Sequence, residues 1–384
     1  MGGGPAKEHL LIALPLPEPT SLLASLRAQH PHLEIAYHQS TRDPSNPPPP
    51  TLFAKTTILV TFATLPPNPS TDAPNLTWLH LFSAGSNHIQ SHPLYTSTDI
   101  TITTSSGVHG PTIAEWAVLT RLVESRKYNH LLAQQRSHAW QTHDPALANV
   151  RDQVGATLGV LGYGSIGRQV ARVASALGMR VLAYTASAKD SPASRRDGGF
   201  VVPGTGDVEG VVPEGWFSGL GREDLHSFLG RGIDWLVVCV PLTEATRGFL
   251  GEEEFRVLRE GLVERERERE RAGFGFGVQV EEGSSTTRKP FVTNIARGPI
   301  IDQRALIAAL KDGTLQGAAL DVTDPEPLPA DSELWDLENV VVTPHISGNG
   351  VAYEDRAFQV LGVNLERREK GERLINVVKR ERGY

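Results

Sequence analysis

Short apolar runs separated by polar stretches mark the N-terminal part of the chain. They are rich in leucine, isoleucine and β-branched residues, and they cover residues 10–14, 33–37, 57–61, 76–82 and 100–104. Segments compatible with helices, such as 21–29, lie between them. Apolar runs of this length that alternate with helical segments are typical of strands in a parallel sheet. The pattern therefore predicts a first, small α/β domain.

A second pattern begins near residue 157, where an apolar run leads directly into three glycines. Residues 158–161 predict a buried strand, and residues 162–167 (GYGSIG) predict a turn. The apolar stripe after this turn predicts a helix. In such a unit Gly162 permits the tight turn, Gly164 admits a pyrophosphate and Gly167 lets the helix pack on the strand. The helix N-terminus offers N–H groups to the phosphates. With another strand expected over 180–184, this context predicts a dinucleotide site.

The residue after that second strand bears on the choice of dinucleotide. An acidic residue is expected there to bind the ribose 2′-hydroxyl of NAD, but this chain has Thr185. No carboxylate would repel a 2′-phosphate, and Lys189, Arg195 and Arg196 follow closely. We therefore expect NADP(H) to be favoured over NAD(H). The alternative is that these cations are ordinary solvated charges.

Two later segments depart from a regular α/β pattern. Residues 190–221 form a spacer rich in glycine and proline, and residues 264–271 alternate strictly between Glu and Arg. Alternation places like charges four residues apart, which weakens a helix. We expect residues 261–289 to be a flexible, solvated insertion without chemistry. Before the glycine turn, Pro111 is placed to start one long helix that reaches about residue 136 and crosses between two domains.

Length, charge and cysteine content narrow the class of protein. The 384 residues suffice for about two domains with cores of their own. The net charge of −7 argues against a general nucleic-acid partner. Cys239 is the single cysteine, which excludes an internal disulfide or a thiolate metal cluster and fits a reducing compartment. No apolar run has the length of a membrane span and the N-terminus does not resemble a signal peptide, so we expect a cytoplasmic location.

Four short segments at predicted strand ends carry candidate chemistry. Arg297 directly follows the apolar run at 291–295, and His345 follows another at 340–342. A proline-bounded loop after residue 320 contains Asp321 and Glu326. The turn at 82–87 consists of small residues, which leave backbone N–H groups free to meet an anion. Taken singly, a lone Arg after a strand or a single His is more often structural or solvated than catalytic.

As an ordered set, these segments resemble the D-isomer-specific 2-hydroxyacid dehydrogenases. The matching pieces are GYGSIG, VCVPLT, NIARG, ALDVTDPEP and TPHISG, in the family's order, within a resemblance that spans about residues 78–376. Within this family, the chain most resembles glyoxylate/hydroxypyruvate reductases of the fungal type. The resemblance implies an α/β fold of two Rossmann-like domains with a cleft between them. One is a flavodoxin-like substrate domain (1–125 plus 349–384), and the other a doubly wound NAD(P)-binding domain (126–348).

The resemblance also implies roles for individual residues. Arg297 would bind the substrate carboxylate and polarise its 2-oxo group, His345 would donate the proton, and Glu326 would orient the imidazole; these three are the expected catalytic residues. Substrate binding would involve Arg297, His345 and the backbone of Ala84 and Gly85. The residues expected to bind the cofactor are Tyr163, Gly164, Ser165, Ile166, Thr185, Arg195, Arg196, Val240, Pro241, Thr246, Ile295, Ala296, Arg297, Asp321 and His345. Of these, Asp321 would meet the nicotinamide carboxamide, and no metal is expected.

The implied activity is reversible reduction of a small 2-oxo acid, such as glyoxylate or hydroxypyruvate, to the D-2-hydroxy acid. The implied assembly is a homodimer built around the cofactor domains. A different class stays open, because the same fold serves corepressor-like proteins in which the dinucleotide is a switch for a protein partner. A third possibility is a decayed enzyme whose insertion at 261–289 disturbs folding.

Overall fold

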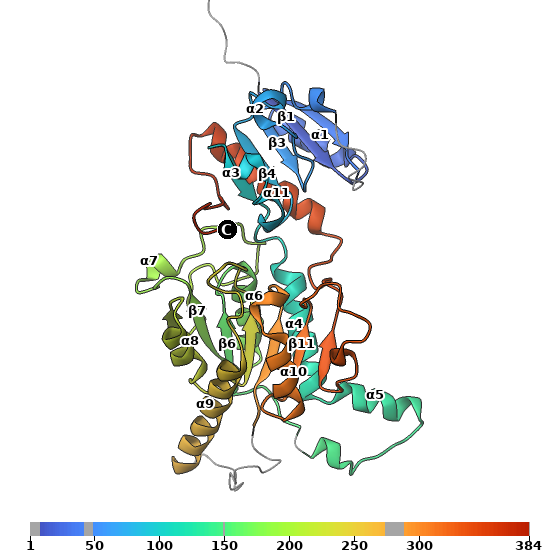
Figure 1. The fold of residues 1–384 in the computed structure, drawn as a ribbon, viewed down its shortest axis with the longest axis vertical. Helices are drawn as coiled ribbons and strands as arrows, with labels where there is room; N and C mark the ends of the chain where they lie inside the picture. Colours follow the sequence, from blue (N-terminus) through green and yellow to red (C-terminus); the bar gives the residue numbers. More distant parts are fainter. Residues whose placement is uncertain (1–7, 42–48, 149, 273–287, 384) are drawn as a thin grey trace, which may run out of the picture. The chain divides into compact units, whose positions relative to one another are not determined.

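Two units, each built on one parallel sheet, make up the chain. The computed structural model describes residues 8–41, 49–148, 150–272 and 288–383. Unit 1 comprises Met1–His109, Gly198–Val202 and Gly350–Tyr384, and unit 2 comprises Gly110–Asp197 and Pro203–Asn349. In each unit, helices cover both faces of the sheet (Figure 1). The predicted fold class of two Rossmann-like α/β domains is confirmed.

The sheet of unit 1 has its strands in the order β2-β1-β3-β4-β5, all parallel. This is the flavodoxin-like order. The strands are β1 (His9–Leu14), β2 (Glu34–Gln39), β3 (Ile58–Thr61), β4 (Trp78–Leu81) and β5 (Thr101–Thr104). Each of them lies within or overlaps one of the five expected apolar runs, because the branched and aliphatic side chains of those runs fill the core on both faces.

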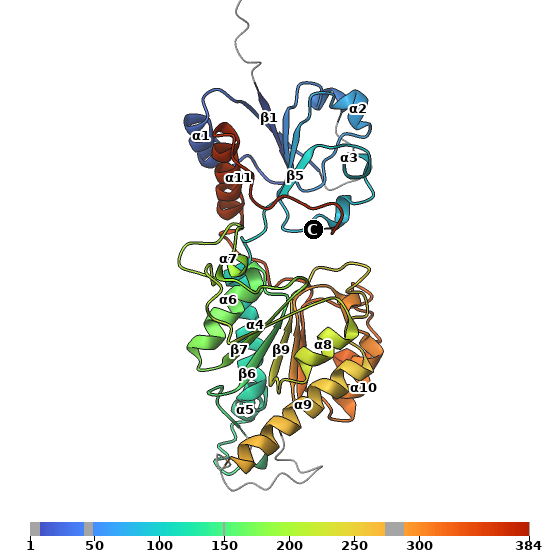
Figure 2. The ribbon, with the colours of Figure 1, turned by 90° about the vertical axis from the view of Figure 1, so that its left-hand side faces the viewer.

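Helices from both ends of the chain cover one face of this sheet. The helices α1 (Thr20–Gln29) and α11 (Tyr353–Glu369) lie side by side there (Figure 2). Leu23 and Leu26 of α1 and Phe358 and Leu361 of α11 are buried in the same cluster. The short elements α2 (Pro69–Asp72), α3 (Pro93–Thr96), η1 (Pro50–Leu52) and η2 (Asn87–Ile89) complete the unit. Residues 350–384 thus belong to unit 1 although they follow unit 2 in the sequence.

The sheet of unit 2 has seven parallel strands in the order β12-β11-β10-β9-β6-β7-β8. The strands are β6 (Thr157–Leu161), β7 (Arg180–Thr185), β8 (Gly215–Ser218), β9 (Trp235–Val238), β10 (Phe291–Asn294), β11 (Gly317–Leu320) and β12 (Val340–Val342). The strand order changes side at β6: β7 and β8 lie on one side of it, and β9 to β12 lie on the other. In doubly wound sheets ligands bind at this switch point, outside the carboxyl ends of the strands.

The helices of unit 2 alternate with its strands. They are α4 (Gly110–Ser125), α5 (Tyr128–Arg136), α6 (Ser165–Ala176), α7 (Pro192–Arg195), α8 (Arg222–Leu229), α9 (Glu252–Arg271) and α10 (Gln303–Lys311), with the 3-10 turns η3 (Pro145–Leu147), η4 (Gly298–Ile300) and η5 (Glu333–Trp335). The spacer at 190–221 contains α7 and the edge strand β8, so part of it has regular structure. None of the helices that the structure describes has the length and apolar character needed to span a bilayer.

The expected single helix from Pro111 to about residue 136 is wrong. Two helices, α4 and α5, occupy this segment, and Lys127 between them has a left-handed backbone with φ 53°. Residues with positive φ cannot continue a right-handed helix. Ile113, Ala114 and Ala117 of α4 pack in one cluster with α6, which places α4 in unit 2. The division thus falls before α4, whereas the expected domain boundary at 125/126 falls after it.

The expectation of a flexible insertion is wrong for residues 261–271, which form the end of α9. Leu262 of this segment is buried in the described structure. Arg265 and Glu266 have only 11% and 12% of their side chains exposed. The like-charge spacing that argued against a helix is outweighed by the packing and ion pairs of these side chains. Residues 273–287 of the expected insertion lie outside the described residues.

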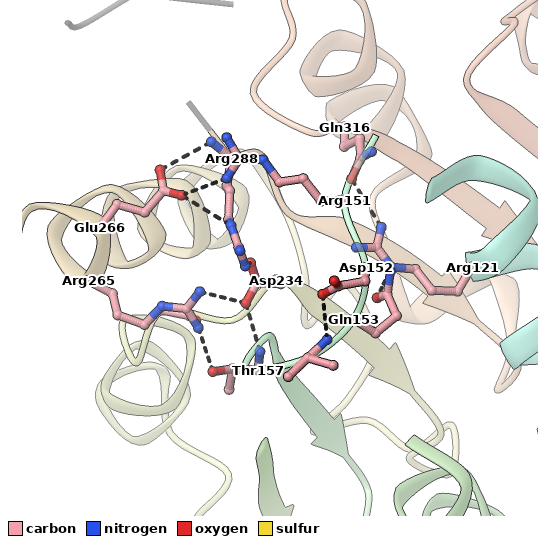
Figure 3. A network of polar contacts seen from close by, with 12 residues as sticks. Arg121, Arg151, Asp152, Gln153, Thr157, Asp234, Arg265, Glu266, Arg288 and Gln316 are labelled. Atoms are coloured by element: carbon pink, nitrogen blue, oxygen red, sulfur yellow. Dashed lines mark hydrogen bonds and ion pairs between the residues drawn. The ribbon is translucent and has the colours of Figure 1, made fainter. Parts of the chain in front are cut away.

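A buried carboxylate explains why the end of α9 is held against the sheet. Asp234, 3% exposed, precedes β9 and accepts hydrogen bonds from Thr157 N at 2.7 Å and Arg265 Nη2 at 2.7 Å (Figure 3). Arg288, which precedes β10, binds the other oxygen at 3.0 Å and also pairs with Glu266. Burial opposes ionisation of Asp234, but the two arginines outweigh it and hold the pKa of Asp234 below its usual range. The network joins α9 to the amino ends of three strands.

Asp234→Ala is expected to lower the free energy of unfolding by about 3–5 kcal/mol, because Arg265 and Arg288 stay partly buried without their partner. Urea unfolding measures this change. Glu214→Ala is the control, since it removes an ion pair with Arg180 whose side chains are about half exposed and costs less than about 1 kcal/mol. Because the pKa of Asp234 is depressed by folding, its contribution is present at neutral pH and is lost as the pH falls through the folded value. Equal stability of the two variants would contradict this account.

Candidate active site

The glycine turn of unit 2 lies between β6 and α6, and each of its three glycines meets a different constraint. Gly162 has φ 108°, and an added Cβ would lie 2.7 Å from the carbonyl carbon of Cys239. At Gly167 a Cβ would lie 2.5 Å from the oxygen of Gly162 and 2.6 Å from a methyl group of Val160. At Gly164 a Cβ would meet no atom within 4 Å. Close packing therefore requires the first and third glycines, whereas the second faces open space.

This open space is suited to a dinucleotide phosphate. Gly164 is the N-cap residue of α6 and is exposed. The first amide groups of a helix have no intrahelical partner, and the helix dipole adds positive potential there. Beneath the turn, the Cys239 thiol donates to Gly162 O at 3.0 Å, and burial raises the pKa of Cys239 to about 12. Cys239, which directly follows β9, is therefore a structural thiol.

Strand register brings the predicted site residues of unit 2 to one edge of the sheet. Leu161 pairs with Val238, Val238 with Asn294, Asn294 with Leu320, and Leu320 with Val342. Since the strands are parallel, the residues that follow these positions emerge together at the carboxyl edge. They include Gly164, Ser165 and Ile166 after β6, Thr185 at the end of β7, Val240 and Pro241 after β9, Ile295, Ala296 and Arg297 after β10, Asp321 after β11 and His345 after β12.

His345 and Glu326 form an ion pair at this edge. The imidazole Nδ1 lies 2.6 Å from Glu326 Oε1, and the two side chains are 46% and 41% exposed. The contact fixes the plane of the ring and leaves Nε2 free to face a reacting group. Glu326 accepts a hydrogen bond from Nδ1–H and so holds the ring in one orientation. The arrangement suits a general acid.

The backbone around His345 depends on a second, buried carboxylate. Asp321 is 2% exposed, and its oxygens accept from Thr343 Oγ1 at 2.6 Å and from the N–H groups of Ile346 and Ser347, both at 2.9 Å. The hydroxyl of Ser347 also binds it. His345 itself has φ 56°, and its N–H donates to Asp321 O at 2.9 Å. Asp321 therefore holds the loop that presents the imidazole. Its contact with a nicotinamide carboxamide stays a prediction.

Arg297 is half-buried next to these residues. It directly precedes η4, and its Nη1 donates to Ala296 O at 2.6 Å. Asn294 fixes the turn, since its side chain accepts from Ala296 N and donates to Arg297 O. Burial lowers the pKa of Arg297, and the Glu326 carboxylate opposes that effect. The guanidinium remains a cation that can bind a carboxylate with two parallel hydrogen bonds.

The cations after β7 have partners within the chain. Arg195 Nε donates to Lys189 O at 2.8 Å, and its guanidinium lies over the ring of Trp216. Arg196 pairs with Glu209 at 2.8 Å, with both side chains exposed. An exposed pair of this kind contributes little free energy, so a phosphate could displace Glu209. The Thr185 hydroxyl donates to Ser187 O at 2.8 Å.

Two predicted cofactor residues have side chains engaged elsewhere. Tyr163 is buried, and its hydroxyl donates to Asp207 Oδ2 at 2.8 Å, so only its backbone could face a ligand. Thr246 is buried too, and its hydroxyl donates to Pro241 O at 2.7 Å. Thr246 therefore shapes the turn after β9.

Sequence reasoning missed Arg168 and Asp207, which hold the segment after β7 against α6. Arg168 is 4% exposed and donates to the carbonyl oxygens of Asp207 and Arg195. Asp207 accepts from the N–H groups of Val211 and Val212 in addition to Tyr163. The position of Arg168, a charged residue beside the apolar stripe of α6, was the sequence signal that could have indicated its buried role. In unit 1, Ala84 and Gly85 follow β4 as expected, and Ser83 Oγ donates to Gly85 O at 2.8 Å.

Gly164→Ala is expected to leave urea unfolding close to that of the wild type and to weaken dinucleotide binding by at least about tenfold, because the new methyl group fills the open space at the helix N-terminus. Isothermal titration with NADPH measures the affinity. Gly167→Ala is the matched control, since its Cβ would clash with backbone and so lower stability. Unchanged affinity in Gly164→Ala would place the phosphate elsewhere.

Comparisons with known proteins agree with this geometry. The family model of the D-isomer specific 2-hydroxyacid dehydrogenase, NAD binding domain, matches residues 119–201 and 282–347. A glyoxylate reductase from Korarchaeum cryptofilum is 28% identical over 310 residues, which is 80% of this chain and 78% of that protein. A glyoxylate reductase from Thermofilum pendens is 29% identical over 315 residues, 80% of this chain and 76% of that protein.

Solved structures show the same fold over nearly the whole chain. A D-isomer specific 2-hydroxyacid dehydrogenase from Xanthobacter autotrophicus Py2, in complex with NADPH and MES, superposes with a TM-score of 0.70 at 26% identity and covers 99% of this chain and 100% of that chain. For the NADPH-dependent glyoxylate/hydroxypyruvate reductase from Sinorhizobium meliloti the TM-score is 0.69 at 23% identity, with 98% and 100% covered, which shows the fold. The predicted resemblance to the D-isomer-specific 2-hydroxyacid dehydrogenases is confirmed over the residues that the family model matches.

Proposed function

We propose that this protein is an NAD(P)-dependent oxidoreductase that reversibly reduces a small 2-oxo acid to the D-2-hydroxy acid. The observation that carries the proposal is the pairing of His345 with Glu326 at 2.6 Å, on the same sheet edge as the glycine turn and Arg297. The named relatives, both glyoxylate reductases, support glyoxylate or hydroxypyruvate as the first substrates to test.

Each proposed residue has a separate chemical task. Arg297 would bind the substrate carboxylate and polarise the 2-oxo group, which a lysine could not do with the same fork. His345 would donate a proton to the carbonyl oxygen during reduction and accept it back during oxidation. Glu326 would keep the imidazole oriented. When bound, the reduced nicotinamide supplies the hydride, so hydride and proton together convert the ketone into the alcohol. In unit 1, backbone N–H groups of Ala84 and Gly85 would bind the substrate carboxylate.

For the cofactor we propose a preference for NADP(H). Thr185 stands where an acidic residue would bind the 2′-hydroxyl of NAD, and the ion pair of Arg196 with Glu209 is exposed. Neighbouring structures contain NADPH or NADP, which supports the same preference. The corepressor-type binding protein is less well supported than the reductase, since the named relatives are enzymes.

We also propose a homodimer in the cytoplasm, with no nucleic-acid or membrane partner. Several large apolar side chains of unit 2 are exposed around α4 and α5, namely Leu119, Tyr128, Leu131, Trp140 and Val154. The most exposed of these five side chains is Trp140, at 93%. Figure 1 shows α5 standing beside the sheet of unit 2, and none of its described residues is buried. We infer that these exposed side chains lie at an interface, where a second copy of the chain would cover them.

The function is tested by following nicotinamide oxidation with NADPH and NADH against glyoxylate, hydroxypyruvate, pyruvate and a bulkier 2-oxo acid. We expect rapid oxidation with at least one small acid and faster turnover with NADPH. Cofactor binding without oxidation of any of these acids would contradict the reductase and favour the binding protein. A preference for NADH would overturn the role given to Thr185 and Arg196.

Arg297→Ala and His345→Ala separate the two proposed tasks. Arg297→Ala is expected to lower kcat and raise KM together, because the residue would act in both binding and polarisation. His345→Ala is expected to lower kcat by at least about a hundredfold, since general acids contribute that much or more, while the Kd for NADPH stays near that of the wild type. Steady-state kinetics and cofactor titration report both. Wild-type rates in either variant would remove that residue from the site.

A further inference from the structure

A chain of fully buried polar side chains joins β4 to the edge strand β5 in the unit 1 sheet. Trp78 and His80 come from β4, Thr103 from β5, and Ser105 follows β5; all four are 0% exposed. Polar groups buried in this way are costly unless each finds a partner. Here they bind one another in a single line of hydrogen bonds.

The order of donors in this line is fixed by its last member: the Ser105 hydroxyl donates to Leu81 O, so its oxygen accepts from His80 Nε2–H. The Trp78 indole can only donate, and its Nε1 lies 2.8 Å from Thr103 Oγ1. The Thr103 hydroxyl then donates its proton to His80 Nδ1, also at 2.8 Å. His80 Nδ1 is therefore an acceptor, and the ring proton lies on Nε2, which donates to Ser105 Oγ at 3.2 Å. Burial lowers the pKa of His80 to about 3, so the ring is neutral, as this pattern requires.

The line ends at the turn that follows β4. The Ser105 hydroxyl donates to Leu81 O at 3.2 Å. The Ser105 N–H lies 3.0 Å from Leu81 O and 2.9 Å from Ser83 O, so it holds the backbone on both sides of Phe82. Ser83 in turn donates from its hydroxyl to Gly85 O. Ser105 therefore sets the path of residues 82–85.

We propose that His80 is a positioning residue for the substrate carboxylate: its Nε2–H tautomer, selected by the hydroxyls of Thr103 and Ser105, fixes Ser105 and through it the backbone amides of residues 84 and 85. The proposal rests on the function proposed above, in which Ala84 and Gly85 bind that carboxylate. Amide donors stabilise a bound anion only if they point at it before it arrives, because small misplacements are costly.

His80→Leu tests the proposal, because leucine keeps the volume and loses both hydrogen bonds. We expect KM for the 2-oxo acid to rise by about tenfold or more, with a smaller change in kcat and an unchanged Kd for NADPH. His80→Gln is the rescue variant, since its amide offers one acceptor and one donor at a similar spacing, and KM should return close to that of the wild type.

Trp78→Phe is the matched control. It destabilises unit 1 by removing the first donor but leaves the bonds from Thr103 to His80 and from His80 to Ser105 in place, so KM should hardly change. Hydrogen exchange of the amides at 82–85 provides a readout without substrate, and we expect faster exchange in His80→Leu than in Trp78→Phe. If His80→Leu does not fold, Ser105→Ala replaces it, because it removes the same hydroxyl link and keeps the backbone N–H.

The outcomes separate this inference from the proposed function. Equal exchange at residues 82–85 in His80→Leu and Trp78→Phe, or a KM that rises in both in proportion to lost stability, would reduce His80 to a purely structural residue. A wild-type protein that reduces no 2-oxo acid would overturn the proposed function, whereas the exchange rates would still decide whether His80 controls the turn.

Discussion

Parallel pairing of the strands in unit 2 is the constraint on which the site depends. Because every strand runs in the same direction, the loops after β6, β9, β10, β11 and β12 emerge at one edge. Residues far apart in the sequence, such as Gly164, Arg297 and His345, therefore reach the same edge without any direct bond between them. The packing of Gly162 and Gly167 against neighbouring backbone then determines how closely α6 approaches this edge.

Two buried aspartates complete this sheet, one at each edge. Asp234 lies at the amino edge, where it joins Thr157 to the arginines of α9 and of the segment before β10. Asp321 lies at the carboxyl edge, where it binds the loop that carries His345. The oxygens of both carboxylates accept hydrogen bonds from donors within the chain. The first stabilises the fold, and the second gives the exposed imidazole of His345 a defined backbone.

Much of the architecture follows from local sequence signals. The apolar runs predict the strands, and the glycine spacing predicts the turn before α6, because both depend on residues close together in the chain. The helical end of α9 was not predicted, since it is decided by tertiary contacts, and neither was the break at Lys127, whose backbone is left-handed. Charge alternation argued against a helix at residues 264–271, yet Arg265 and Glu266 gain partners there that only the folded sheet provides.

The candidate site shows the same division between local and tertiary information. Arg297, Glu326 and His345 could be selected from their motifs, and the contact of His345 with Glu326 agrees with the roles predicted for them. The hydrogen bonds made by the side chains of Tyr163, Arg168 and His80 depend on partners distant in sequence. Motif spacing carries no information about such partners.

The most direct test of the central claim compares the two enantiomers of a 2-hydroxy acid as substrates for oxidation. Purified protein is given NADP⁺ with either D-glycerate or L-glycerate, and the reduced nicotinamide is followed over time. The account predicts oxidation of the D-enantiomer alone, with loss of the reaction in His345→Ala. Oxidation of the L-enantiomer, or of neither by a protein that binds the cofactor, would contradict it.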